Sequence, residues 1–290
     1  MSAEVNASNA AVFEAPAEAS DRPVGVFDSG VGGLTVMREI MKLMPKERII
    51  YFGDTARVPY GNKSGETVTR FSEQIMRFLL KEDVKAIVVA CNTASAYALE
   101  ALERDCPVPI IGVIVPGAAA AVKATRNGRI GVIATAGTIA SGIYPREIGK
   151  LNPDSRVLGK ACPLFVPLVE EGLWQDPVTR EIARRYLEEL MNEDIDTLIL
   201  GCTHYPLIQG VIGEVAGAGV TLVNPAYETA RQLEILLRER ELLSPEAPGL
   251  GNEPQYRFYV SDMAEQFKSF ANAIIPYGIL TAKKIDIERY

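Results

Sequence analysis

Two stretches of this sequence each end an apolar run in a cysteine: AIVVACNT at 86–93 and TLILGCTH at 197–204. Each run has the length and the residue types of a buried strand. A helix-start pattern follows each cysteine, with Asn92-Thr93 in the first stretch and Pro206 in the second. Strands that lead directly into helices are typical of α/β folds with parallel sheets.

The same alternation of apolar runs and helical stretches continues along the chain. We expect strands at 24–27, 48–52, 86–90, 109–113, 129–134, 155–159, 197–201 and 220–223. We expect helices at 33–44, 66–81, 94–105, 116–125, 177–191 and 227–240. The Pro- and Gly-rich stretch 244–254 is expected to be a loop, and the tail after it has a mixed pattern.

The chain also contains a weak internal repeat. VGVFDSG at 24–30 resembles IGVIATA at 130–136, and the two cysteine stretches resemble each other in the same order. One interpretation is that any two strand–helix units look alike. The other is that the chain folds as two similar α/β halves, each with one cysteine at the carboxyl end of a strand, where open α/β sheets bind ligands. Two such halves would place Cys91 and Cys202 on opposite sides of one cleft.

Composition excludes several classes of protein. Hydrophobic residues make up 48% of the 290 residues and charged residues 23%, which is enough apolar material for a large core. The net charge is −7 and no Lys/Arg block occurs, so we expect no nucleic-acid partner. No apolar run approaches the roughly 18 to 20 residues that cross a bilayer, so we expect no membrane span.

The N-terminus and the cysteines indicate a cytoplasmic protein. Residues 1–21 are rich in Ala, Ser, Asn and Glu and carry no basic residue, so we expect a disordered extension and no secretion signal. Four cysteines without an export signal favour free thiols. Because no C-x-x-C occurs and the one histidine stands beside one cysteine, we expect no metal site.

Two thiols from facing halves suggest proton transfer on both faces of one carbon. One thiolate removes a proton while the other thiol donates one from the far side, so the stereocentre inverts. A thiol at a helix N-terminus has its thiolate stabilised, so we expect lowered pKa values for Cys91 and Cys202. Cys106 and Cys162 each precede a proline and read as inert core residues. No lysine stands in a pyridoxal-phosphate motif, so we expect no cofactor.

Other polar residues fall on the same predicted edge. Asp28-Ser29-Gly30 ends a strand before a Gly-rich turn that suits a carboxylate, although Asp28 is also a common turn residue. The stretch 54–61 follows the next strand and is either part of the site or a surface turn. His204 is either a partner of the Cys202 thiol or a structural histidine. Glu170 is either a partner of His204 or of a substrate amine, or a solvated charge.

At this point the residues resemble the bacterial glutamate racemases, of the aspartate/glutamate racemase family. The matching segments come in the family's order and together are highly specific. They are GVFDSGVGGL at 25–34, YFGDTARVPYG at 51–61, VACNTAS at 89–95, GVIAT at 131–135, CPLFVPLVEEG at 162–172 and LGCTHYP at 200–206.

The resemblance implies an isomerase that interconverts L- and D-glutamate without a cofactor and supplies D-glutamate for peptidoglycan. By similarity, Cys91 acts on D-glutamate and Cys202 on L-glutamate. Asp28, Glu170 and His204 match the family's auxiliary residues. The residues that match its substrate-binding pairs are Asp28-Ser29, Tyr60-Gly61, Asn92-Thr93 and Thr203-His204.

The family fold further implies two similar α/β domains with mainly parallel sheets and the active site in the cleft between them. We therefore place one domain at 22–115 plus 225–290 and the other at 116–224. We expect a homodimer. Some relatives are activated by a peptidoglycan precursor, so such an activator is a candidate partner.

Three other interpretations stay open at the level of sequence. An aspartate racemase shares two cysteines and a related fold but reads a shorter side chain. A Cys/His hydrolase would use Cys202 and His204 and leave Cys91 without a role. A non-catalytic anion-binding protein would tolerate the loss of both thiols.

Overall fold

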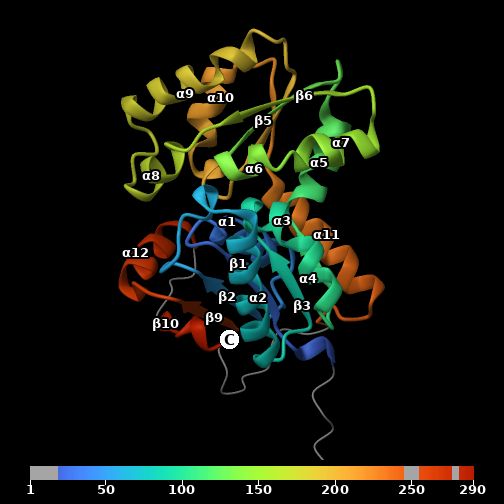
Figure 1. Ribbon diagram of the computed structural model, residues 1–290, viewed down its shortest axis with the longest axis vertical. Coiled ribbons are helices and arrows are strands. Elements are labelled where there is room, and N and C mark those ends of the chain that lie inside the picture. Colours follow the sequence, from blue (N-terminus) through green and yellow to red (C-terminus); the bar gives the residue numbers. More distant parts are fainter. Residues whose placement is uncertain (1–18, 245–254, 276–280) are drawn as a thin grey trace, which may run out of the picture.

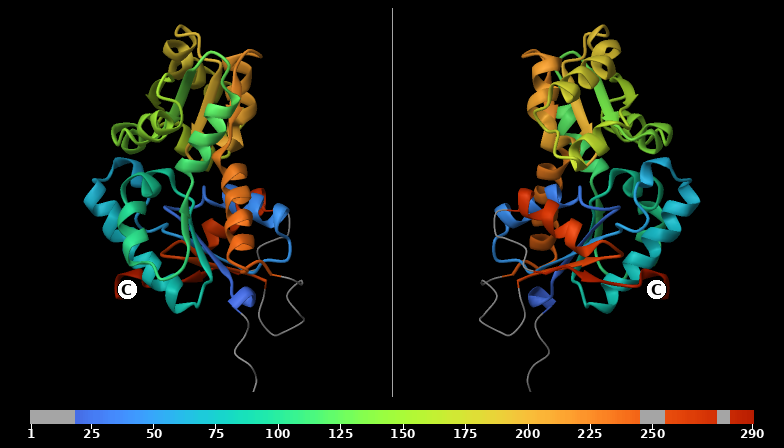
Figure 2. Two further views of the ribbon diagram at one scale, coloured as in Figure 1. Left: turned by 90° about the vertical axis from the view of Figure 1, so that its right-hand side faces the viewer. Right: turned by 90° about the vertical axis from the view of Figure 1, so that its left-hand side faces the viewer.

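The computed structural model describes residues 19–244, 255–275 and 281–290, which form two lobes stacked along the long axis of the molecule (Figure 1). Each lobe contains one β-sheet with helices packed around it (Figures 1 and 2). Every strand pairing in both sheets is parallel. The α/β fold class with parallel sheets is therefore confirmed.

The lower lobe holds a six-stranded sheet in the order β10-β9-β2-β1-β3-β4. Its strands are β1 (Val24–Asp28), β2 (Ile49–Gly53), β3 (Ala86–Val89), β4 (Ile110–Gly112), β9 (Tyr256–Val260) and β10 (Lys283–Lys284). The helices of this lobe are α1 (Leu34–Leu43), α2 (Gly65–Lys81), α3 (Asn92–Tyr97), α4 (Leu99–Asp105), α11 (Pro225–Glu239) and α12 (Ala264–Ile274) (Figure 1).

The upper lobe holds a four-stranded sheet in the order β6-β5-β7-β8. Its strands are β5 (Arg129–Ala134), β6 (Arg156–Ala161), β7 (Thr197–Gly201) and β8 (Thr221–Val223). Its helices are α5 (Ile114–Ala124), α6 (Ala136–Ala140), α7 (Ile143–Leu151), α8 (Phe165–Glu170), α9 (Pro177–Met191) and α10 (Gln209–Ala216). Four 3-10 helices complete the described chain: η1 (Ala19–Asp21), η2 (Tyr60–Asn62), η3 (Tyr205–Ile208) and η4 (Ile287–Arg289).

The internal repeat corresponds to a repeated topology. In the lower sheet β1 lies between β2 and β3, and in the upper sheet β5 lies between β6 and β7. The glycine of the repeat occupies equivalent places, since Gly25 pairs with Ile87 of β3 and Gly131 pairs with Leu198 of β7. The two lobes are therefore similar in strand order as well as in sequence pattern.

All eight expected strands are present, but several other elements were missed. The expected helix 94–105 is divided at Ala98 into α3 and α4. Helices α6, α7, α8, α10 and α12 and strands β9 and β10 were not predicted. Most of these helices are short and contain Gly, Pro or Thr, which weakens the helical pattern. None of the helices in the described ranges combines the length and the apolar character that crossing a membrane requires.

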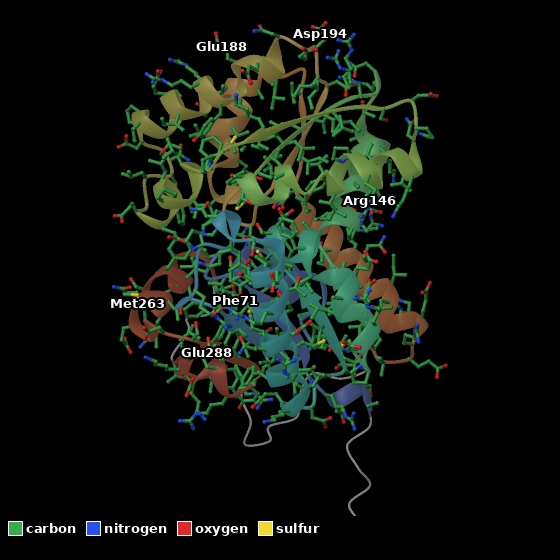
Figure 3. All side chains as sticks on the ribbon, viewed as in Figure 1. Phe71, Arg146, Glu188, Asp194, Met263 and Glu288 are labelled. Carbon is green, nitrogen blue, oxygen red and sulfur yellow. The ribbon has the colours of Figure 1, made fainter. Side chains whose placement is uncertain are left out.

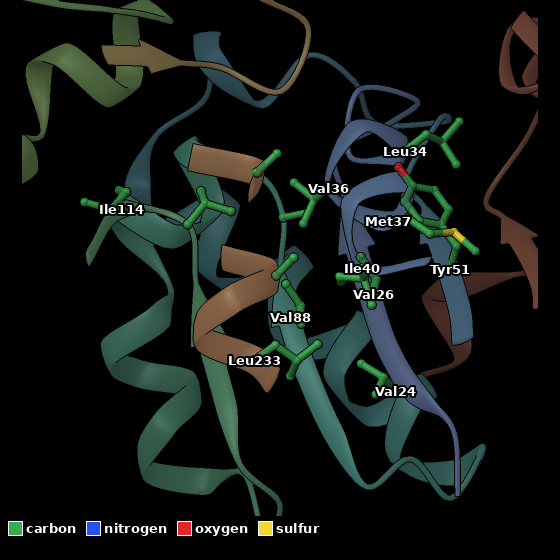
Figure 4. Close-up of a cluster of buried hydrophobic side chains, with 14 of the residues drawn as sticks. Val24, Val26, Leu34, Val36, Met37, Ile40, Tyr51, Val88, Ile114 and Leu233 are labelled. Carbon is green, nitrogen blue, oxygen red and sulfur yellow. The ribbon is translucent and has the colours of Figure 1, made fainter. Parts of the chain in front are cut away.

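The apolar core explains how the lower sheet and its helices hold together. Val24 and Val26 of β1 pack with Ile40 of α1 and Leu233 of α11, all fully buried (Figure 4). Helix α11 also packs on α5 of the upper lobe, so one long helix touches both lobes. The proposed domain boundaries near residues 116 and 224 stay a prediction, supported by the strand content of the two sheets.

The expected N-terminal extension falls mostly outside the described residues. Residues 19–21, which we placed in that extension, form η1 instead, and Ser20 in it is buried. The expected loop 244–254 also lies outside the described residues, apart from Ser244.

A buried ion pair fixes η1 to the sheet. Lys85 Nζ lies 2.6 Å from Glu47 Oε2, and both side chains are 1% exposed. Lys85 Nζ also donates a hydrogen bond to the Ser20 carbonyl, and the Ser244 backbone N–H donates to Glu47 Oε1. Because burial penalises the charged form, the pKa of Lys85 is lowered, although the bond to Glu47 opposes this. This pair joins four segments that are distant in the sequence.

We predict that Lys85→Met destabilises the protein by about 3 to 5 kcal/mol, because it leaves the Glu47 carboxylate buried without its charge partner. The double variant Lys85→Met/Glu47→Leu should regain at least half of that loss. As a control, Lys42→Met removes the exposed pair with Glu39 and should cost less than about 1 kcal/mol. Urea unfolding measures all three, and equal losses for Lys85→Met and Lys42→Met would contradict the prediction.

Candidate active site

The carboxyl ends of the two sheets face each other across the junction of the lobes. Asp28 ends β1, Cys91 follows β3 at a distance of two residues, and Cys202 directly follows β7. Thr203 Oγ1 of the upper lobe donates a hydrogen bond to Asp28 Oδ1 of the lower lobe at 3.4 Å. Thr35 Oγ1 of α1 donates to the Thr203 carbonyl at 2.9 Å. These bonds close the two edges onto each other.

Both thiols line one small cavity between the lobes. The cavity encloses about 340 Å³ of empty space, including its opening to solvent. Nine of the predicted site residues line it: Ser29, Tyr60, Gly61, Cys91, Asn92, Thr93, Cys202, Thr203 and His204. Asp28 and Glu170 do not line it, and each instead contacts a residue that does. The structure therefore brings the predicted residues together in one place.

Cys91 is buried and lies near the carboxylate of Asp28. Its Sγ lies 3.7 Å from Ser29 Oγ, and the residue is 6% exposed. Burial, together with the charge of the nearby Asp28 carboxylate, raises the pKa of the Cys91 thiol to about 12, while hydrogen bonds from the Ala94 backbone and Ser29 act in the opposite direction. The expected lowering of this pKa is therefore wrong for Cys91, because desolvation outweighs the start of the short helix α3.

Cys202 has a different neighbour. Its Sγ lies 3.7 Å from His204 Nδ1, and His204 Nε2 lies 2.9 Å from Glu170 Oε1. Burial alone would lower the pKa of His204, but the hydrogen bonds to Cys202 and Glu170 raise it to about 10. The protonated imidazole therefore places a positive charge beside the Cys202 sulfur. The interpretation of His204 as a thiol partner fits this geometry.

Asp28 is fully buried beneath the cavity. Its Oδ2 accepts a hydrogen bond from the Gly30 backbone N–H at 3.1 Å, as in a turn, and its Oδ1 accepts from Thr203. Burial raises its pKa, while the charge of His204 and the backbone amides at Gly33, Gly30 and Ser29 oppose that change. Asp28 therefore forms a turn and also contacts the opposite lobe, and its role toward a proton-transfer partner or a substrate ammonium stays a prediction.

The wall at Tyr60-Gly61 is fixed by a buried carboxylate. The Tyr60 hydroxyl donates to Asp54 Oδ2 at 2.5 Å, and Ser261 Oγ, just after β9, donates to Asp54 Oδ1 at 2.8 Å. The neighbouring Gly61 lies so close to the upper lobe that an added Cβ would be 2.7 Å from Thr135 Cβ. The stretch 54–61 is therefore part of the cavity wall rather than a plain surface turn.

Arg57 strengthens this wall from outside. Its Nε donates to Asp54 Oδ2 at 2.7 Å, its guanidinium lies 4.0 Å from the centre of the Phe71 ring, and its Nη1 lies 3.1 Å from Glu288 Oε1. Phe71 and Glu288 both lie in the lower lobe (Figure 3). Residues near the end of the printed sequence thus support the loop that carries Tyr60.

Val58 and Pro59 of the stretch 54–61 also line the cavity, together with two residues that were not predicted from the sequence, Thr135 and Val166. Thr135 Oγ1 lies 2.9 Å from Thr93 Oγ1 and accepts from the Thr138 backbone N–H as the cap of α6. The signal for Thr135 was present, because it directly follows β5 at the same edge as Cys202. Val166 carries no comparable signal.

The comparisons with known proteins agree with this geometry. Residues 24–233 match the family model described as Asp/Glu/Hydantoin racemase. A glutamate racemase of Geobacter metallireducens is 52% identical over 254 residues, which is 88% of this chain and 93% of that protein. The names of such relatives favour glutamate over the shorter aspartate.

Two solved structures share the fold over almost the whole chain. The glutamate racemase of Francisella tularensis, in complex with D-glutamate, is 39% identical with a TM-score of 0.85, and the match covers 93% of this chain and 100% of that one. The Escherichia coli glutamate racemase, in complex with L-glutamate and the activator UDP-MurNAc-ala, is 31% identical with a TM-score of 0.74, covering 91% and 98%. With its two facing thiols and these relatives, the chain belongs to the Asp/Glu/Hydantoin racemase family, among the glutamate racemases.

Proposed function

We propose that this chain interconverts L- and D-glutamate without a cofactor, with Cys91 and Cys202 as the two acid/base groups. The observation that carries the proposal is that two thiols from opposite lobes line one cavity. A carbon held between them can lose a proton to one sulfur and gain a proton from the other. Inversion then needs no movement of a single base from one face to the other.

The two thiols have different surroundings, and this difference indicates which thiol removes the proton in each direction of the reaction. Cys91 rests as a neutral thiol because burial raises its pKa to about 12. Cys202 faces the protonated His204, whose positive charge would stabilise the negative charge of this sulfur when it acts as the base. In this resting state Cys202 removes the α-proton of L-glutamate and Cys91 donates a proton to form D-glutamate. D-glutamate meets the reverse arrangement, with Cys91 as the base.

The remaining residues hold the substrate and stabilise the carbanion. The starts of α3 and of the 3-10 helix η3 bring backbone N–H groups to the cavity wall, and such donors suit carboxylates. Ser29, Asn92, Thr93 and Thr203 supply side-chain donors around the same space. We assign Asp28, Glu170 and His204 auxiliary roles, with Glu170 acting through His204.

We extend the proposal to the role of the product and to partners. D-glutamate made by this chain would supply peptidoglycan synthesis in the cytoplasm. Because the Escherichia coli relative was solved with the activator UDP-MurNAc-ala, we propose a peptidoglycan precursor as a candidate activator. The homodimer expected from the sequence is kept as part of the proposal. A Cys/His hydrolase is the second candidate, since Glu170, His204 and Cys202 form a hydrogen-bonded series.

The direct test is incubation with L-glutamate in deuterated water, after dialysis against a chelator and with no cofactor added. We expect D-glutamate that carries deuterium at the α-carbon, because its new proton comes from a thiol that exchanges with solvent. Chiral chromatography with mass spectrometry measures both the isomer and the label. A requirement for added metal or pyridoxal phosphate, or release of ammonia in place of D-glutamate, would contradict the proposal.

Removing one thiol should separate the two half-reactions. Cys91→Ser and Cys202→Ser should each abolish racemisation, since inversion needs both groups. Each should still eliminate HCl from one enantiomer of a β-chloro glutamate analogue, because elimination needs one base. We expect the two variants to prefer opposite enantiomers, measured as the 2-oxo acid that forms after elimination. The same preference in both variants would exclude opposed thiols.

The two thiols should also differ in their reaction with iodoacetamide at neutral pH. Thiolates are the alkylated form, so Cys202 in Cys91→Ser should react faster than Cys91 in Cys202→Ser, by about tenfold or more. The two residues have equal exposure of 6%, so access does not account for a difference. Peptide mass spectrometry follows each site. His204→Asn should slow the labelling of Cys202, and equal rates for both thiols would refute the assigned protonation states.

A further inference from the structure

A buried tyrosine of the upper lobe contacts a residue that lines the cavity from the lower lobe. The hydroxyl of Tyr144, in the first turn of α7, donates a hydrogen bond to Asn92 Oδ1 at 2.7 Å. Asn92 begins α3, follows Cys91 directly and lines the cavity, and Tyr144 is 1% exposed. No sequence motif pointed to Tyr144, because it lies in a helix that was not predicted.

Because the two ends of a side-chain amide differ, this hydrogen bond fixes which way the Asn92 amide points. An asparagine side chain has one oxygen that accepts and one nitrogen that donates. When Tyr144 occupies Oδ1, the group that Asn92 has left for a ligand is the Nδ2 donor. A donor suits a carboxylate, whereas the oxygen would repel one. Free rotation of the amide would present the wrong atom part of the time.

We propose that Tyr144 is a positioning residue for substrate binding, which fixes the Asn92 amide so that its N–H groups face a substrate carboxylate. This inference rests on the proposed function and adds to it the residue that sets the direction of one binding group. The bond crosses between the lobes, so a residue of the upper lobe orients a binding group of the lower lobe.

The surroundings of Tyr144 hold its hydroxyl in place. An added Cβ at Gly201 would lie 3.2 Å from the Tyr144 ring, and an added Cβ at Gly117 would lie 3.5 Å from its hydroxyl. Glycine at position 201 therefore leaves room for the ring against β7, and the hydroxyl lies within ordinary contact distance of α5. Burial, with the charge of Cys202, raises the pKa of the Tyr144 hydroxyl, so it stays protonated and acts as a donor.

A second tyrosine provides the matched control. The Tyr97 hydroxyl also donates a hydrogen bond across the lobes, to the Gly137 carbonyl at 2.8 Å. That acceptor is a backbone atom and cannot rotate, so this bond joins the lobes without orienting a cavity side chain. If Tyr144 merely joins the lobes, Tyr144→Phe and Tyr97→Phe will behave alike. If it orients Asn92, they will differ.

The experiment measures racemisation of both enantiomers by the full-length chain and by the two variants. We expect Tyr144→Phe to raise KM for L- and D-glutamate by about tenfold, the scale of one hydrogen bond, while kcat changes by less than about threefold. Tyr97→Phe should leave both constants near those of the unmodified chain. Thermal unfolding of each variant checks that it is folded.

A double-mutant cycle supplies the second readout. In an Asn92→Ala background, adding Tyr144→Phe should have no further effect on the Kd of D-glutamate, because there is no amide left to orient. An unchanged KM in Tyr144→Phe, an equal rise in Tyr97→Phe, or an undiminished effect in the Asn92→Ala background would each overturn the inference. If the unmodified chain does not racemise glutamate, the proposed function itself fails, and that result is separate from these.

Discussion

The close contact between the carboxyl edges of two parallel sheets is the constraint on which the rest of this structure depends. The contact is tight: an added Cβ at Gly32 would lie 2.3 Å from Thr203 Oγ1 and 2.5 Å from His204 Nδ1. The backbone of one lobe at Gly32 therefore packs directly against the side chains of Thr203 and His204 in the other lobe, and this close approach requires glycine. Because both edges end in polar loops, the same contact that joins the lobes also encloses the cavity. The contact between the two sheet edges therefore determines both how the lobes pack and where the reactive side chains lie.

A repeated scaffold carries two unlike thiols. The strand orders around β1 and β5 correspond, so Cys91 and Cys202 occupy related places at the edges of their sheets. Their neighbours break this symmetry: a hydroxyl and a buried carboxylate lie near one sulfur, and an imidazole lies near the other. A reaction between mirror-image molecules of equal free energy needs two opposed groups but does not need them to be identical. In the proposed mechanism, this difference makes Cys91 the resting acid.

The strands and the polar residues that directly follow them could be predicted from the sequence. The eight strands follow from their apolar runs, and the site residues follow from their places after those runs. The raised pKa of Cys91 could not be predicted from the sequence, because the helix start that favours a thiolate is a local feature while the burial that opposes it depends on the folded structure. Thr135 gave a usable signal, being the residue after β5. Tyr144 gave none, since its role comes from a contact between segments 52 residues apart.

Glu170 differs from the other site residues in its contact with solvent, since its side chain is 36% exposed while that of His204 is 4% exposed. The series from Cys202 through His204 to Glu170 is therefore a hydrogen-bonded path from a buried sulfur to bulk water. Cys91 has Ser29 and the buried Asp28 around it and no described path of this kind. In the proposed mechanism, a hydrogen taken from L-glutamate washes out into water sooner than one taken from D-glutamate. The fraction of the substrate's own α-hydrogen that is retained in the product would then differ between the two directions, although the overall equilibrium is symmetric.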